Sequence, residues 1–139
     1  MTPEQAYHEL CFYTLAHGDP MFIHQHVVDA YAAQTADAGA KPIKLAFALI
    51  GLCLRLEHEF SGKEVQRAHM RLAAQRKDWP RFALPSDRGA LSATDVLAHP
   101  AGVVRDAAID AWCAGVWQTY GESHAAVAAL LQEQGIIEP

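Results

Sequence analysis

The stretch 42-PIKLAFALIGLCLRL-56 decides the fold class of this protein. Its apolar residues recur at spacings of three and four, which predicts an α-helix, and a proline at the first position suits a helix N-terminus. The stretch carries Lys44, Gly51 and Arg55 and is shorter than the ~20 residues that span a bilayer. It therefore predicts a helix over residues 42–60 that is buried in a protein core.

Helix-capping residues divide the rest of the chain into further helices. Thr2 and Gln5 match a capping box with Pro3 at the first helical position, and Ser61 with Glu64 matches a second box. No alternating strand pattern and no internal repeat is present. The sequence predicts a single all-α domain over 1–139, a four- to five-helix bundle with helices at about 3–17, 20–36, 42–60, 62–77 and 103–134.

Between residues 78 and 102 the helical periodicity is lost. Pro80, Pro85, Gly89 and Pro100 fall in this segment. These residues interrupt helices, so the segment predicts a long ordered loop before the last helix, with a short helical turn at 93–98.

Composition excludes several classes of protein. The chain has 139 residues, of which 51% are hydrophobic and 19% charged, and this supports one packed core and argues against disorder. Its formal charge of -5 argues against nucleic-acid binding. The sequence contains no nucleotide-binding motif, so we expect no nucleotide cofactor. Three widely spaced cysteines, no secretory signal and no membrane span predict a cytoplasmic protein.

Several of the eight histidines fall on predicted inward helix faces. His69 lies within an apolar stripe, and His124 follows Trp117 by seven residues. His24 and His26 lie about 200° apart on one helix, so at most one of them joins a shared site. Three imidazoles on three helices suit zinc, or iron next, with a fourth position open for water or substrate. Alternatively, each histidine forms a separate hydrogen bond with a backbone carbonyl or a tyrosine in the core, and the three do not converge.

These residues carry a resemblance to a known family. The run 24-HQHVVDAYAAQ-34, the run 68-AHMRLA-73, and Trp112 to Trp117 followed by 124-HAAV-127 resemble a family of small uncharacterised bacterial proteins, a domain of unknown function, over nearly the whole chain. The resemblance implies a metal site of His24, His69 and His124 and favours His24 over His26. Many members have cysteine at the position of Tyr7 and histidine at that of Thr35.

Other residues are candidates for the surroundings of this site or for ligand contacts. Tyr31 and Gln34 lie near His24 on its helix, and the segment 63–88 holds seven of the eleven basic residues. Arg67 or Arg71 could hold a carboxylate or phosphate beside His69. The residues expected to contact the metal ligands or a bound ligand are His26, Tyr31, Gln34, Arg67, Arg71, Trp117 and Tyr120.

Three classes of function follow from these observations. The first is a divalent-metal site, which in an enzyme would favour metal-assisted hydrolysis. The second is a non-catalytic interaction module, such as a homodimer, in which the histidines are structural. The third is a metal-free pocket for a small anionic ligand. A metal site would bring the histidine nitrogens to about 2.0–2.1 Å from one ion, whereas a ligand site would show an apolar pocket with an arginine at its mouth.

Overall fold

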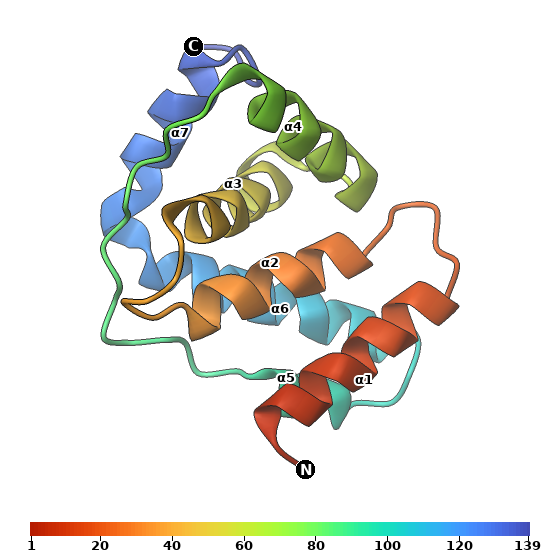
Figure 1. Cartoon of the computed structure of the whole chain (residues 1–139). Coiled ribbons are helices and arrows are strands. Elements are labelled where there is room, and N and C mark those ends of the chain that lie inside the picture. Colours follow the sequence, from red (N-terminus) through yellow and green to blue (C-terminus); the bar gives the residue numbers. More distant parts are fainter.

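Helix α3 (Pro42–His58) lies at the centre of the computed structural model, which describes residues 1–139. Around it pack α2 (His24–Thr35), α4 (Gly62–Gln75), α6 (Val103–Thr119) and α7 (His124–Glu133), as Figure 1 shows. Almost every residue of α3 from Leu45 to Leu54 is buried, on all sides of the helix. Such a helix is stabilised mainly by removal of its apolar side chains from water.

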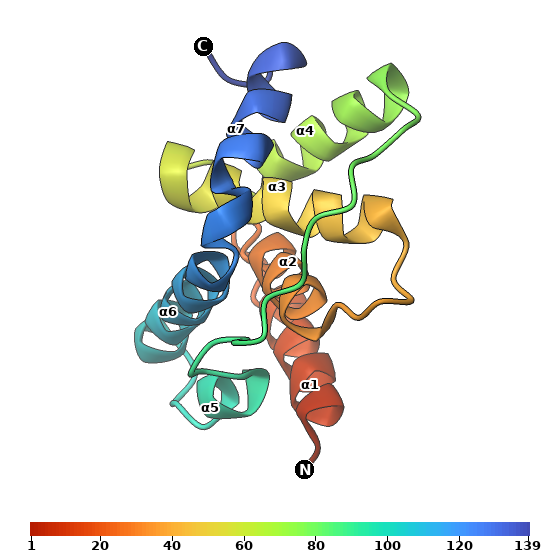
Figure 2. The ribbon, with the colours of Figure 1, turned by 90° about the vertical axis from the view of Figure 1, so that its left-hand side faces the viewer.

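The first helix, α1 (Pro3–Ala16), packs with the short helix α5 (Ala93–Leu97) at the opposite end of the molecule from α4 and α7 (Figure 2). The hydroxyl of Tyr13 ties α1 to the start of α6. It donates to the Asp106 carboxylate at 2.7 Å and accepts the backbone N–H of Gly102 at 2.9 Å. None of the helices combines the length and the apolar character that crossing a bilayer requires.

The predicted all-α class is confirmed, but the predicted number of helices is too low. The structure has seven α-helices, a short 3₁₀ helix (Gly121–Ser123) and no strands. Where one helix over 103–134 is predicted, α6 ends at Thr119 and α7 begins at His124. The chain turns there because the buried Tyr120 hydroxyl donates to the Ala33 carbonyl at 2.6 Å, and Gly121 follows directly.

The second helix begins four residues later than the predicted start at residue 20. The Asp19 carboxylate accepts the backbone N–H groups of Met21 and Ile23, and Phe22 adopts a positive φ of 58°. These bonds hold residues 19–23 in a turn. The N–H of Gly62 donates to the Met21 carbonyl at 2.7 Å, so the turn is also fixed by the start of α4.

The loop predicted over residues 78–102 is shorter in the structure, because α5 follows at residue 93, where a helical turn over 93–98 is predicted. Residues 76–92 form this long loop, which joins α4 to α5 and runs along the outside of the molecule past α3 and α2 (Figure 2). Two side chains hold its far end against the C-terminal end of α2. Gln34 Nε2 donates to the carbonyls of Arg88 and Leu91, and Arg88 Nη1 donates to the carbonyls of Gln34 and Ala36. The buried Phe82 anchors the middle of the loop in the core.

Candidate functional site

The three histidines of the predicted metal site each make a separate contact with the protein. His24 on α2 has its Nδ1 3.1 Å from the Thr14 hydroxyl. His69 on α4 donates from Nε2 to the Phe47 carbonyl at 2.9 Å and stacks on the Phe47 ring. His124 at the start of α7 donates from Nε2 to the Trp117 carbonyl at 2.8 Å.

These contacts do not support a shared metal site. A carbonyl oxygen only accepts, so the Nε2 atoms of His69 and His124 carry protons and are not free to bind an ion. Nowhere in the chain is a group of three or more His, Cys, Asp or Glu side chains placed to hold a metal ion. Zinc or iron binding by His24, His69 and His124 therefore stays a prediction, and the arrangement matches the alternative in which each histidine is bonded separately.

His26 lies apart from these histidines, on a buried face of α2. The residue is 2% exposed, and burial together with the nearby Arg55 guanidinium lowers the pKa of its imidazole to about 4. The imidazole is consequently neutral near pH 7. The Nδ1 atom of His26 has no hydrogen-bond partner.

The other predicted site residues hold the fold together. Tyr31 stacks on Tyr7 with ring centroids 3.8 Å apart, which ties α2 to α1. Gln34 fastens the long loop and also accepts the buried Trp112 Nε1–H at 2.9 Å. Trp117 donates from Nε1 to the Glu57 carboxylate at 3.0 Å and stacks on His124, and Tyr120 bonds to α2.

Arg67 and Arg71 are exposed on α4, and neither makes an ion pair within the chain. The only arginine–carboxylate pair in the structure joins Arg55 to Asp110 at 3.2 Å, and His8 Nε2 lies 3.6 Å from Glu4 Oε1. Neither Arg67 nor Arg71 lines the pocket that follows. The predicted anion contact beside His69 therefore gains no support from the structure.

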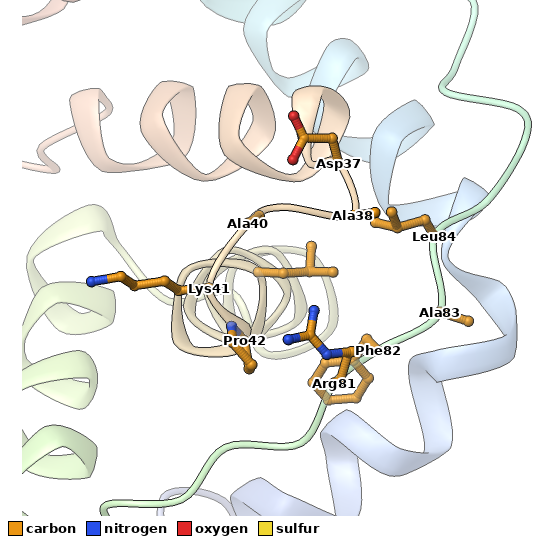
Figure 3. A pocket seen from close by; sticks show the side chains of 10 residues that line it. Asp37, Ala38, Ala40, Lys41, Pro42, Arg81, Phe82, Ala83 and Leu84 are labelled. Carbon is orange, nitrogen blue, oxygen red and sulfur yellow. The ribbon is translucent and has the colours of Figure 1, made fainter.

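A pocket lies between the α2–α3 connection, the first turn of α3 and the middle of the long loop (Figure 3). Its volume is about 550 Å³. Six of its ten lining residues are hydrophobic, so its interior favours an apolar ligand group. The lining consists of Asp37, Ala38, Ala40, Lys41, Pro42, Leu45, Arg81, Phe82, Ala83 and Leu84.

Local sequence shapes both walls of this pocket. The Asp37 carboxylate accepts a hydrogen bond from the N–H of Gly39 at 2.9 Å, which stabilises a turn between α2 and α3. Pro42 is the first residue of α3. On the opposite wall, Phe82 is 7% exposed and inserts into the core. Arg81 is consequently held at the pocket while its own side chain stays exposed.

The electrostatic character of the pocket comes from Arg81. Figure 3 shows its guanidinium pointing over the pocket towards Pro42, whereas the ammonium of Lys41 points away. Arg81 makes no hydrogen bond or ion pair within the chain, so its donors are free. The first turn of α3 has no acidic residue and no side-chain cap, and the positive end of its dipole adds to the same field.

The lining has no histidine, cysteine, serine or threonine, and its only carboxylate, Asp37, bonds to the backbone. An activated nucleophile needs a neighbouring base, so these groups suit binding better than nucleophilic catalysis. The sequence did not single out this pocket. Its one local signal is an arginine directly before an aromatic residue in the proline-bounded segment 80–85.

Comparison with known proteins places the chain in a family. No curated protein and no solved structure matches it. A family model described as "Family of unknown function (DUF5946)" matches residues 4–121, from α1 to the break after α6, so His124 lies outside the matched range. Because this match covers most of the chain and agrees with the resemblance noted in the sequence, the protein belongs to the family of unknown function DUF5946.

Proposed function

We propose that the protein binds a small amphipathic anion, of the carboxylate class, in the pocket formed by the start of α3 and the long loop. The observation that carries this proposal is the unpaired guanidinium of Arg81, which points over an apolar cavity. Arginine presents donors in a planar fork that matches a carboxylate. The ligand's carboxylate would meet Arg81, and its apolar part would lie against Leu45 and Phe82.

Size and charge support this class of ligand over simple inorganic anions. A volume of about 550 Å³ is within the range of small-molecule pockets and much larger than a phosphate or acetate needs. The lining carries one negative side chain, Asp37, and two positive ones, Lys41 and Arg81, of which Arg81 points over the cavity. An apolar chain or ring with one negative group therefore matches the pocket better than a neutral or cationic molecule.

Calorimetric titration with octanoate, and with octanol as its neutral counterpart, tests the proposal. We expect octanoate to bind the wild type more tightly than octanol. Replacing Arg81→Gln should weaken octanoate binding about tenfold to a hundredfold, the value of one charge-assisted contact. The matched control is Lys77→Gln, which removes a positive charge from the same loop but not from the pocket lining.

Equal binding of octanoate and octanol would contradict the assignment, as would an Arg81→Gln variant with unchanged affinity. A similar loss in Lys77→Gln would show that general positive charge, and not this pocket, attracts the anion. Amide shifts in NMR spectra upon octanoate addition should fall in residues 37–45 and 81–84.

A further inference from the structure

A second pocket, named here the Ser123 pocket, lies where the long loop passes the turn between α6 and α7 (Figure 1). Residues 83–87 form one wall and residues 118–123 the other, and the volume is about 570 Å³. Only three of its eleven lining residues are hydrophobic, whereas the lining around Arg81 is mostly hydrophobic. Such a lining offers hydrogen bonds more than apolar contact, so it favours a hydrophilic ligand.

The hydroxyl of Ser123 lies in the wall of this pocket without a partner in the protein. The residue is 6% exposed and directly precedes α7, a position where a serine side chain commonly accepts a helix N–H. It makes no such bond, because its backbone is helical, with φ -98° and ψ -7°, and not extended. The side-chain atoms that are sealed from solvent without a partner are His26 Nδ1 and Asp29 Oδ2, so the Ser123 hydroxyl is not sealed. It therefore stays open to the pocket that Ser123 lines, where a ligand can bond to it.

Two carboxylates give the Ser123 pocket a negative charge that nothing in its lining offsets. Asp87 comes from the loop wall and Glu122 from the opposite wall, and both are exposed. No lysine, arginine or histidine lines the pocket, and neither carboxylate is in an ion pair. Arg88, which follows Asp87, turns its guanidinium towards carbonyls at the end of α2. A cation that enters the pocket therefore meets no competing positive side chain.

We propose that the Ser123 pocket binds a hydrophilic organic cation of the amino-sugar class, a molecule with one amino group and several hydroxyl groups. The amino group would lie in the field of Asp87 and Glu122, and a ligand hydroxyl would bond to the Ser123 hydroxyl. Ser86 and Gln118 add a second hydroxyl and an amide to the lining. These groups both donate and accept, so they match further hydroxyl groups of the ligand.

The size and the donor set of the pocket favour this ligand over a metal ion. Protein metal sites usually supply three or more ligand side chains. The lining has two carboxylates and neither histidine nor cysteine. A volume of about 570 Å³ is also far larger than a single ion needs. A positive charge carried on a larger hydroxylated molecule therefore fits better.

This inference is independent of the proposed carboxylate pocket. The two pockets share Ala83 and Leu84 of the loop, but their charged groups differ and they select ligands of opposite charge. Arg81→Gln should weaken octanoate binding and should not weaken binding of the cation. The failure of either assignment can therefore be told from the failure of the other.

The test compares glucamine with sorbitol, which has the same carbon chain and a hydroxyl in place of the amino group. We expect NMR titration of the wild type to show glucamine binding about threefold to tenfold more tightly, the modest value of exposed charges. The shifts should include the amides of Ser86 and Ser123. Hexylamine carries the charge without the hydroxyl groups, so it should bind more weakly than glucamine.

Three variants locate the contributions. Asp87→Asn combined with Glu122→Gln removes both charges and should bring the affinities for glucamine and sorbitol close together. Glu133→Gln combined with Glu138→Gln is the matched control, because it removes two carboxylates outside the lining and should keep the preference. Ser123→Ala should weaken glucamine and sorbitol alike, by about threefold to tenfold. It should leave the urea midpoint of unfolding unchanged, because the hydroxyl has no partner in the protein.

Equal affinity of the wild type for glucamine and sorbitol would overturn the inference, and so would a preference that survives removal of Asp87 and Glu122. The same loss of preference in the Glu133 and Glu138 control would show that overall charge, and not this pocket, attracts the amine. Unchanged affinities in Ser123→Ala would contradict the bond assigned to its hydroxyl. If that variant does not fold, the paired charge variants still decide. An absence of amide shifts at high millimolar glucamine would also refute the site.

Discussion

Replacing Gln34→Ala is expected to destabilise the protein strongly, although the residue lies at the end of a helix. Its side chain makes three hydrogen bonds: Oε1 accepts from Trp112, and Nε2 donates to the carbonyls of Arg88 and Leu91. These bonds join α2, α6 and the far end of the long loop, which are distant in sequence.

The magnitude follows from where each partner lies. Trp112 is fully buried, so its Nε1–H would lose its partner in the core at a cost of about 1–3 kcal/mol. The two loop carbonyls lie nearer the surface, where water replaces the lost donor, and contribute about 0.5–1 kcal/mol each. The free energy of unfolding should therefore fall by about 2–5 kcal/mol in total.

Gln34→Glu separates these contributions. A carboxylate still accepts from Trp112 but cannot donate to the two loop carbonyls, which it would face with a negative charge. Its cost should therefore decrease at low pH, where the carboxyl is protonated and regains one donor. Gln118→Ala on α6 is the matched control, because this exposed glutamine makes no side-chain hydrogen bond and should change stability by less than about 0.5 kcal/mol.

Urea unfolding followed by tryptophan fluorescence measures these differences, and the indole N–H resonance of Trp112 reports on its bond directly. A loss below 1 kcal/mol in Gln34→Ala would refute the view that this side chain holds the loop in place.

Three further predictions concern buried groups in the helical core. Gly51→Ala should destabilise the protein by about 1–3 kcal/mol, because the new methyl group overlaps the Asp29 carboxyl, and Asp29→Ala should recover part of this loss. Burial raises the pKa of Asp29 above its unfolded value of about 3.9, so its contribution to stability is present below pH 4 and is lost as the pH rises through the folded pKa. Asp29→Asn should remove that decline in urea titrations from acid to neutral pH. His26 has a pKa lowered to about 4, so the protein should lose up to about 3 kcal/mol as the pH falls from about 6.5 to 4, and His26→Gln should flatten this change.

Each of these predictions has its own contradicting outcome. If Gly51→Ala lowers the free energy of unfolding by the same amount in the wild type and in Asp29→Ala, the carboxyl is not what the new methyl group overlaps. Parallel pH profiles of the wild type and either Asp29→Asn or His26→Gln would show that the substituted group does not titrate differently in the folded and unfolded states.

Local signals in the sequence were sufficient to predict most of the helix starts. The capping boxes at Thr2 and Ser61 both form, with reciprocal bonds to Gln5 and Glu64. The apolar run of α3 is buried as predicted, because such a helix has no polar face to present to water. In these places the information lies within a few residues of the feature that it determines.

Features that depend on distant contacts were not predictable in this way. The late start of α2 depends on a bond between Met21 and Gly62, and the break before α7 on a bond between Tyr120 and Ala33. Periodicity correctly identified inward-facing histidines such as His69, but a helical wheel does not say which inward residues of different helices meet. The pocket around Arg81 likewise joins two loops that are separated in sequence by the whole of α3 and α4.

The attachment of the long loop has a consequence for how its order can be observed. No backbone N–H from residue 77 to residue 91 donates to another backbone group. In this segment only the N–H of Gly89 donates to a side chain, the carboxylate of Asp87. The loop is held by side chains, whereas amide exchange with solvent deuterium reports on backbone bonds. This segment should therefore exchange nearly as fast as an unfolded peptide while keeping a fixed position, so rapid labelling here would not mean that the pocket wall is mobile.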